Sequence, residues 1–189
     1  MKTILILSLL VNLCFAVAFI KLYYEQKKLK LKKWRRMAIT DSLTGVYNRN
    51  AYIYDIANID IKKGKYGIIL FDIDGFKKIN DEKGHLFGDN LLKEVAGTLS
   101  LVFSSKEYKI YRIGGDEFAV ITKNRTEQQN IIKMIEVKEY LNQKGDIRLS
   151  SGYSMIKGNV KKAFKYADEM LYADKESRKK KQYKKIDRF

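Results

Sequence analysis

Near the middle of the chain, two glycines and two acids lie between two short apolar segments. Residues 110–113 and 118–121 have the composition of β-strands, and the Gly114-Gly115 pair between them predicts a tight antiparallel turn. Glycine suits such a turn because it reaches positive φ without steric cost. The pattern therefore predicts a β-hairpin that carries Asp116 and Glu117 at its tip.

Folding gives no reason for two neighbouring acids at a turn, because their charges repel each other. The pair is better explained by a bound cation or by a proton-transfer step that uses the carboxylates. An ordinary solvated turn is the alternative, since Gly-Gly-Asp sequences are common in turns. The hairpin tip is thus the first candidate for a functional site.

The chain contains one cysteine, Cys14, and one histidine, His85. These counts exclude an internal disulfide framework, a cysteine-based zinc site and a site built from several histidines. Any metal bound by this chain must therefore be held by oxygen atoms. Oxygen ligands favour magnesium, manganese or calcium.

The net charge of +16 is concentrated in two segments. Residues 21–36 and residues 175–189 each hold eight Lys or Arg, which leaves 22 basic and 19 acidic residues elsewhere. A face that binds DNA or RNA would need a basic stripe across the folded domain. The distribution favours a membrane surface and argues against nucleic acid as a partner.

Residues 3–20 carry no charge, and together with Leu22 and Tyr23 they are long enough to cross a bilayer as one helix. The basic cluster that follows would keep that side in the cytoplasm. We therefore expect a single-pass anchor over residues 1–23 in the cytoplasmic membrane, with membrane lipids as partners. A basic helical stalk over residues 24–39 follows. A cleaved signal peptide is the alternative, because Ala16-Val17-Ala18 has the form of a cleavage site.

Strand and helix patterns alternate along the rest of the chain. Residues 67–71 form a continuous apolar run, typical of a buried central strand, that ends on Asp72. Residues 75–89 are polar and interrupted by glycines, which indicates a connection, and an amphipathic helix is expected from Asn90. Further helices are expected from Ala51, capped by Asn50, and near residue 160, with a strand over residues 147–155.

Thr126 and Gln129 form a capping box that predicts the start of another helix. Strands that alternate with helices predict an α/β fold, in which a sheet is covered by helices. With 46% hydrophobic residues among 189, the chain has enough apolar material for one such domain and an appendage.

Five motifs, in order along the chain, resemble the GGDEF family of diguanylate cyclases. They lie at residues 41–49, 71–81, 84–89, 112–118 and 167–175. The resemblance implies a palm-like α+β domain over residues 40–180, with a mostly antiparallel central sheet similar to that of nucleotide cyclases and polymerases. A basic tail over residues 181–189 would follow. The implied activity is the synthesis of cyclic di-GMP from two GTP molecules by a homodimer.

For catalysis, the resemblance implies that Asp72, Asp116 and the Ile73 carbonyl bind metal, with two Mg²⁺ or Mn²⁺ ions for each GTP. It also implies that Asp116 acts in catalysis with assistance from Glu117. Two divalent ions suit a reaction in which a 3′-hydroxyl attacks an α-phosphate and pyrophosphate leaves. Taken alone, Asp72 could simply be an acid that ends a strand.

The triphosphate would be bound by backbone N–H groups near Phe76 and by three cations, Lys77, Lys175 and Lys179. Lys77 is included among the catalytic residues. Lys175 and Lys179 lie one helical turn apart. The family usually has arginine at the position of Lys179, and lysine lacks its bidentate fork. A solvated tail lysine is the alternative for Lys179.

Asn80 and Asp89 occupy the positions that bind guanine in the family. One carboxylate and one amide satisfy the guanine edge, which needs an acceptor for its N–H groups and a donor for its O6. A helix cap and a turn residue are the respective alternatives. Arg49, His85 and Arg112 are expected mainly to organise the fold.

Many family members carry an Arg-x-x-Asp motif upstream of the hairpin that binds cyclic di-GMP and inhibits the enzyme. Ser105 and Tyr108 stand at those positions here. The alternative function, a catalytically inactive protein that binds the dinucleotide, usually depends on this motif, so an enzyme is favoured. An electrostatic scaffold at the membrane would explain the lysine clusters but would leave the acids without a role.

Overall fold

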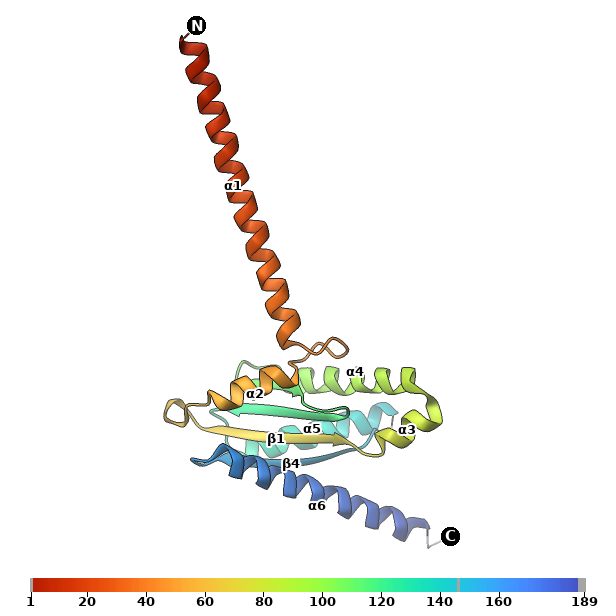
Figure 1. Ribbon diagram of the computed structural model, residues 1–189. Coiled ribbons are helices and arrows are strands. Elements are labelled where there is room, and N and C mark those ends of the chain that lie inside the picture. Colours follow the sequence, from red (N-terminus) through yellow and green to blue (C-terminus); the bar gives the residue numbers. More distant parts are fainter. Residues whose placement is uncertain (1, 146, 187–189) are drawn as a thin grey trace. The chain divides into compact units, whose positions relative to one another are not determined.

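The computed structural model describes residues 2–145 and 147–186. The chain divides into two compact units, Met1–Ala38 and Ile39–Phe189. Helix α1 (Lys2–Ile39) makes up the first unit, and an α/β domain makes up the second (Figure 1). The site predicted from the sequence lies in the second unit.

The described part of the chain has no helix that is both long enough and apolar enough to cross a membrane. Within α1, Phe15 and the apolar residues after it are soon followed by Lys21, and three more lysines follow by residue 30. The predicted anchor over residues 1–23 and the localisation in the cytoplasmic membrane are therefore wrong. Membrane lipids lose their support as partners for the same reason.

The second unit contains one sheet of four strands in the order β2-β3-β1-β4. The central strand β1 pairs antiparallel with both β3 and β4. The predicted antiparallel sheet flanked by helices is thus confirmed. The elements are α2 (Arg49–Ala57), the 3₁₀ helix η1 (Ile61–Lys63), β1 (Tyr66–Ile73), α3 (Phe76–Lys83), α4 (His85–Val102), β2 (Tyr108–Arg112), β3 (Glu117–Lys123), α5 (Glu127–Gly145), β4 (Leu149–Ile156) and α6 (Val160–Ile186).

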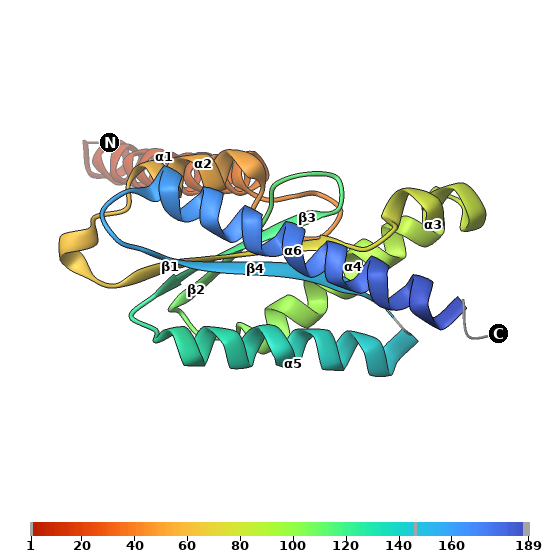
Figure 2. The same ribbon diagram turned by 90° about the horizontal axis from the view of Figure 1, so that it is seen from below.

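Both faces of the sheet are buried, which explains the continuous apolar run in β1. Ile69 and Phe71 belong to a core cluster with residues of α4 and α5. Ile68 and Leu70 belong to a second cluster with residues of α2 and α6. Helices therefore cover the two faces (Figures 1 and 2), and successive side chains of β1 enter different clusters, as the alternation of a strand requires.

Helix α6 approaches β4 very closely at Gly152. A Cβ atom at this position would overlap the carbonyl oxygen of Ala167 and lie 2.5 Å from the backbone nitrogen of Leu171. Only glycine leaves room for two backbones at such a separation. The contact holds α6 along the sheet, with its later turns beside the end of β1.

Two local predictions differ from the structure. The N-cap of α2 is Asn48, whose side chain accepts a hydrogen bond from Ala51 N–H at 3.0 Å, so the expected cap at Asn50 is wrong. The polar connection expected over residues 75–89 instead forms α3 and the start of α4. Gly75 and Gly84, with φ of 72° and 83°, precede these helices and provide the sharp changes of direction.

The start of α5 agrees with the sequence pattern. Thr126 N–H donates to Gln129 Oε1 at 3.0 Å, and Gln129 N–H donates to Thr126 Oγ1 at 3.2 Å. These reciprocal hydrogen bonds are the predicted capping box. Near the C-terminus, residues 181–186 continue helix α6, whereas the sequence indicated a separate tail there.

Candidate active site

The pairing of β1 with β3 gathers the predicted acids at one end of the sheet. Asp72 on β1 lies opposite Glu117 on β3, and Asp116 directly precedes Glu117. The N–H of Ile73 donates to the carbonyl oxygen of Asp116 at 3.3 Å, which ties the end of β1 to the hairpin. Asp72 is only 8% exposed. Asp72 is thus brought next to Asp116 and Glu117, although more than forty residues separate it from them in the sequence.

The turn differs from the sequence expectation in its backbone. The glycines with positive φ are Gly45, Gly75, Gly84 and Gly158, so the positive φ expected for Gly114-Gly115 is absent. The hairpin closes through a hydrogen bond of 2.9 Å from Ile113 N–H to Glu117 O. A Cβ atom at Gly114 would overlap Oε2 of Glu117. The absence of a side chain at Gly114 leaves room for the carboxylate of Glu117.

The closeness of the acids affects their protonation. Burial, followed by repulsion from Asp72, raises the pKa of Asp116. Burial, followed by repulsion from Asp116 and then from Asp72, raises the pKa of Glu117. Lys175 opposes both shifts but does not cancel them. The cluster therefore has an excess of negative charge that a further cation would stabilise.

Two cations contact this cluster from different elements. Lys175 on α6 donates to Asp72 Oδ1 at 2.7 Å. Arg112, at the end of β2, donates through Nε and Nη2 to the carbonyl oxygen of Gly115 at 3.1 and 2.7 Å. Its Nη1 donates to Asp41 Oδ1 at 3.2 Å. Arg112 thus holds the hairpin turn, in agreement with its predicted role in organising the fold.

The donor atoms at this end of the sheet are of the kind that a hard divalent ion prefers. Among the described residues, no three His, Cys, Asp or Glu side chains are grouped closely enough to hold an ion by themselves. Asp72, Asp116 and the Ile73 carbonyl could nevertheless supply oxygen ligands at one edge. Magnesium is commonly held in this way, by one or two carboxylates together with substrate phosphates.

The residues predicted to bind guanine lie on neighbouring helices. Asn80 is within α3 and Asp89 is within the first turns of α4, so neither is a helix cap or a turn residue. The Oδ1 atom of Asn80 is buried and accepts no hydrogen bond within the described chain. A Cβ atom at Gly88 would overlap this oxygen. The close packing at Gly88 brings Asn80 next to the turn that carries Asp89.

The residues predicted to bind phosphate begin α3, directly after the acidic edge. Gly75 is the N-cap of this helix and provides no side-chain hydrogen bond to its first N–H groups. Phe76 is half-buried and Lys77 is exposed. The side chain of Lys179 lies outside the described residues.

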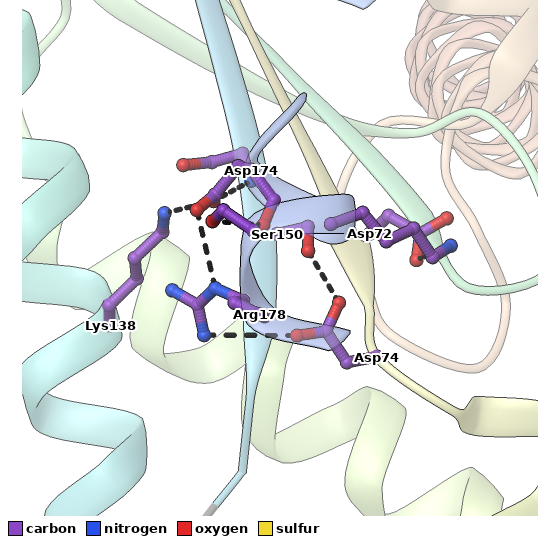
Figure 3. A network of polar contacts seen from close by, with 9 residues as sticks. Asp72, Asp74, Lys138, Ser150, Asp174 and Arg178 are labelled. Atoms are coloured by element: carbon purple, nitrogen blue, oxygen red, sulfur yellow. Dashed lines mark hydrogen bonds and ion pairs between the residues drawn. The ribbon is translucent and has the colours of Figure 1, made fainter. Parts of the chain in front are cut away.

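A polar network that the sequence did not predict lies beside the acids (Figure 3). Asp74 Oδ1 accepts a hydrogen bond of 2.5 Å from Ser150 Oγ, and Asp74 Oδ2 lies 3.7 Å from Arg178 Nη1. Asp174 on α6 links Arg178 to Lys138 on α5. The spacing of Asp174 and Arg178, four residues apart on a helix, was the one signal in the sequence.

Comparison with known proteins decides the family. The model of the family described as "Diguanylate cyclase, GGDEF domain" matches residues 38–181. This chain belongs to the GGDEF family. The acids, the half-buried start of α3 and the guanine-site candidates all lie within the matched range.

The curated relatives from Escherichia coli K12 include two proteins named as diguanylate cyclases or probable ones. The chain is 36% identical to the probable diguanylate cyclase DgcI over 152 residues, which cover 78% of this chain and 34% of DgcI. It is 31% identical to the diguanylate cyclase DgcN over 186 residues, which cover 87% of this chain and 45% of DgcN. The chain thus spans less than half the length of these relatives.

Among solved structures, the fold resembles the coiled coil and GGDEF domain of DgcB from Caulobacter crescentus, which was solved in complex with cyclic di-GMP. The TM-score is 0.78 at 26% identity, over 85% of this chain and 93% of that one. The FimX GGDEF domain from Pseudomonas aeruginosa, at 17% identity and a TM-score of 0.67, shares the fold. These likenesses agree with the antiparallel sheet and its helical layers.

Proposed function

We propose that this chain is a diguanylate cyclase that condenses two GTP molecules into cyclic di-GMP and releases two pyrophosphates. The observation that carries the proposal is the cluster of Asp72, Asp116 and Glu117 at one sheet edge, with Lys175 beside it. Membership of the GGDEF family and similarity to named diguanylate cyclases support the same reaction. This reaction needs carboxylate oxygens for divalent ions next to positive charge for the triphosphate, and both are present at this end of the sheet.

In each of two condensations, a 3′-hydroxyl oxygen forms a bond to an α-phosphorus, and the bond from that phosphorus to pyrophosphate breaks. Asp72, Asp116 and the Ile73 carbonyl would hold Mg²⁺ or Mn²⁺, two ions for each GTP. When bound, these ions lower the pKa of the hydroxyl and neutralise charge on the leaving pyrophosphate. The carboxylate of Asp116 can accept the proton of the hydroxyl once the ions have made that hydroxyl more acidic.

The remaining residues bind and orient GTP. Lys77 and Lys175 supply positive charge to the triphosphate, and the first N–H groups of α3, next to Phe76, can donate to its oxygens. Asn80 and Asp89 bind the guanine edge, because one amide and one carboxylate together supply the donor and the acceptors that this edge needs.

The two GTP molecules require two sites that face each other, so the active form is proposed to be a homodimer. Helix α1 exposes Phe15, Leu22 and Leu29, which are seven residues apart and therefore lie on one side of the helix. Pairing of two α1 helices along this side would bury these residues. The similar DgcB structure contains a coiled coil together with its GGDEF domain, which supports such pairing.

The test is incubation of the purified protein with GTP and Mg²⁺, followed by detection of cyclic di-GMP and pyrophosphate. The expected result is a product that disappears with EDTA and in the variant Asp116→Asn. Loss of one metal ligand should lower turnover by about a hundredfold or more. Most turnover remaining in Asp116→Asn would rule out the assigned site.

An inactive protein that binds cyclic di-GMP is the competing function. It is disfavoured because the acids of the hairpin are all present, whereas Ser105 and Tyr108 replace the usual binding motif for the dinucleotide. Binding of cyclic di-GMP without any product from GTP would favour it. The two functions are therefore separated by the same incubation.

A further inference from the structure

The carboxylate of Asp174 connects three elements beside the proposed site (Figure 3). It accepts hydrogen bonds from Lys138 Nζ on α5 at 2.6 Å, from Ser151 N–H on β4 at 2.9 Å and from Arg178 Nε on α6 at 3.3 Å. Burial would raise the pKa of Asp174, but the hydrogen bonds from Lys138 and Ser151 lower it. Three donors hold this carboxylate in a more fixed position than one surface ion pair would.

Asp174 also determines where the guanidinium of Arg178 points. Because Nε of Arg178 donates to Asp174, the other end of the planar group is directed toward Asp74, and Nη1 lies 3.7 Å from Asp74 Oδ2. That separation is an ion pair but too long for a good hydrogen bond. Asp74 already accepts from Ser150 Oγ at 2.5 Å. An anion with better geometry could therefore replace Asp74 as the partner of Nη1.

Arg178 and Lys175 reach the same edge of the sheet. They lie three residues apart on α6 and thus on one face of the helix. Lys175 contacts Asp72, and Arg178 contacts Asp74, which are the acids on either side of Ile73 in the sequence. The triphosphate of GTP would lie at this edge, where α3 begins with its uncapped N–H groups.

We propose that Arg178 binds the triphosphate of GTP and that Asp174 is the positioning residue that presents Arg178 to it. This inference rests on the proposed function. The family resemblance assigned the second cation of α6 to Lys179. The guanidinium of Arg178 suits the role better, because its fork can donate two parallel hydrogen bonds to one phosphate.

The direct test is the affinity for a GTP analogue in which a methylene group replaces the oxygen between the α and β phosphorus atoms. We expect Arg178→Gln to weaken binding of this analogue about tenfold, because a hydrogen-bonded charge pair is lost. In the cyclase assay, KM for GTP should rise by a similar factor, with a smaller change in kcat.

Arg125→Gln is the matched control. Arg125 forms an ion pair of 3.0 Å with Glu107, and its side chain is 29% exposed, close to the 33% of Arg178. It lies beside Tyr108, at the end of the sheet that does not carry the acids. Its replacement should leave both the affinity for the analogue and KM unchanged.

Asp174→Asn tests the positioning role. Asparagine keeps an oxygen for Ser151 N–H but loses the charge that holds Arg178. The variant should weaken analogue binding by about threefold, since Arg178 remains but is less ordered. The double variant with Arg178→Gln should bind no more weakly than Arg178→Gln alone. A purely structural role would lower the melting temperature and the active fraction without changing the affinity.

The outcomes separate this inference from the proposed function. If the wild-type protein binds neither GTP nor the analogue, the proposed function and the assignment of Arg178 are both wrong. If the wild-type protein binds the analogue and Arg178→Gln binds it equally well, only the assignment of Arg178 is wrong. If the effects of the two substitutions add, Asp174 does not act through Arg178 and its positioning role is overturned.

Discussion

At the scale of single residues, the proposed site contains acids that repel one another, and beside them an acid that accepts hydrogen bonds from three donors. Asp116 lies near Asp72 and Glu117, and its pKa is raised. Asp174 accepts hydrogen bonds from Lys138 and Ser151, and its pKa is lowered. The first arrangement costs stability and leaves charge for a ligand, whereas the second stabilises the fold.

These opposite shifts predict opposite effects of two similar substitutions on the metal-free protein. The folded pKa of Asp116 is above its unfolded value, so the folded state binds more protons and loses stability as pH rises from the unfolded pKa through the folded pKa. Asp116→Asn removes this loss and should raise the melting temperature at pH 7. The gain should shrink as pH falls toward the unfolded pKa near 4.

For Asp174 the sign is reversed. Its folded pKa is below the unfolded value, so its stabilising effect is present above the unfolded pKa and is lost as pH falls through the folded pKa. Asp174→Asn should therefore lower the melting temperature at pH 7. Thermal scans in EDTA across the acidic range measure both effects. A lower melting temperature for Asp116→Asn at pH 7 would contradict the repulsion argued for the cluster.

Single residues also show how far the sequence predicts the site. Asp116 and Glu117 could be named because they stand at a turn where folding gives no reason for two acids, and the family motifs added Asp72 at the end of its strand. The network of Asp174 could not, because hydrogen bonds between α5, α6 and β4 depend on how helices pack and not on spacing along the chain. The turn at Gly114 was mispredicted for a related reason, since the position of the Glu117 carboxylate beside it depends on the folded hairpin.

At the scale of elements, the contact between α6 and β4 controls where the cations of α6 lie. Lys175 follows the close approach at Gly152 by one to two helical turns along α6, as measured from Ala167 and Leu171. A change in this packing would therefore shift Lys175 relative to Asp72. The close contact at Gly152 is therefore one of the features that place Lys175 at the site.

Gly152→Ala should destabilise the domain by about 1–3 kcal/mol, because the added methyl group would overlap backbone atoms of α6 that cannot move aside as a side chain could. Gly97→Ala is the matched control. Gly97 is an exposed residue of α4 whose Cβ would meet no atom within 4 Å, so alanine should stabilise by about 0.5–1 kcal/mol. Urea unfolding of both variants measures the difference. If the two substitutions change the free energy of unfolding equally, α6 can move away from Gly152 without loss of stability, which would contradict this prediction.

The sequence predicted most elements because their signals are local. The apolar run of β1 and the capping box at Thr126 are such signals. The region 75–89 was interpreted as a connection because its glycines and polar residues resemble a loop. It forms α3 and the start of α4 instead, since Gly75 and Gly84 adopt positive φ just before each helix and leave the residues between them helical.

At the scale of the whole molecule, the region of Ser105 and Tyr108, where the family resemblance implies an inhibitory motif in other members, is engaged in contacts of the protein itself. Arg125 forms an ion pair with Glu107 and lies over the ring of Tyr108, with 5.4 Å between the guanidinium carbon and the ring centre. Ser105 Oγ accepts a further contact from Arg125. The contacts of Arg125 with Glu107, Ser105 and Tyr108 therefore occupy the region of Ser105 and Tyr108 with groups of the protein itself.

Cyclic di-GMP should therefore inhibit synthesis only by competing with GTP. The inhibition measured at several GTP concentrations is expected to disappear as GTP is raised. Arg125→Gln serves as a control that should not change this pattern, because Arg125 is engaged with Glu107. A non-competitive pattern at low concentrations of cyclic di-GMP would show that the domain has an inhibitory site elsewhere.

The prediction that α1 crosses a membrane is the largest departure from the sequence interpretation. The uncharged run in residues 3–20 lies within α1, but the described part of this helix is not long and apolar enough to cross a membrane. Past Phe15, α1 soon becomes basic at Lys21 and beyond. What the helix retains on its surface is a set of apolar side chains that a second copy could cover.

The last prediction concerns this role of α1. If two α1 helices pair, the encounter of two catalytic domains becomes intramolecular, which can raise apparent affinity by roughly a hundredfold or more. Ile39–Phe189 is a compact unit, so removal of residues 1–38 should leave a folded domain. Its specific activity should rise steeply with protein concentration, whereas that of the full chain should not.

A foreign dimeric helix in place of residues 1–38 provides the control. It should restore activity at nanomolar concentration, because pairing of the domains and not the sequence of α1 is what synthesis requires. A monomeric helix of equal length should not restore it. If the truncated domain is fully active and independent of concentration at nanomolar levels, the domains pair by themselves and α1 has another purpose.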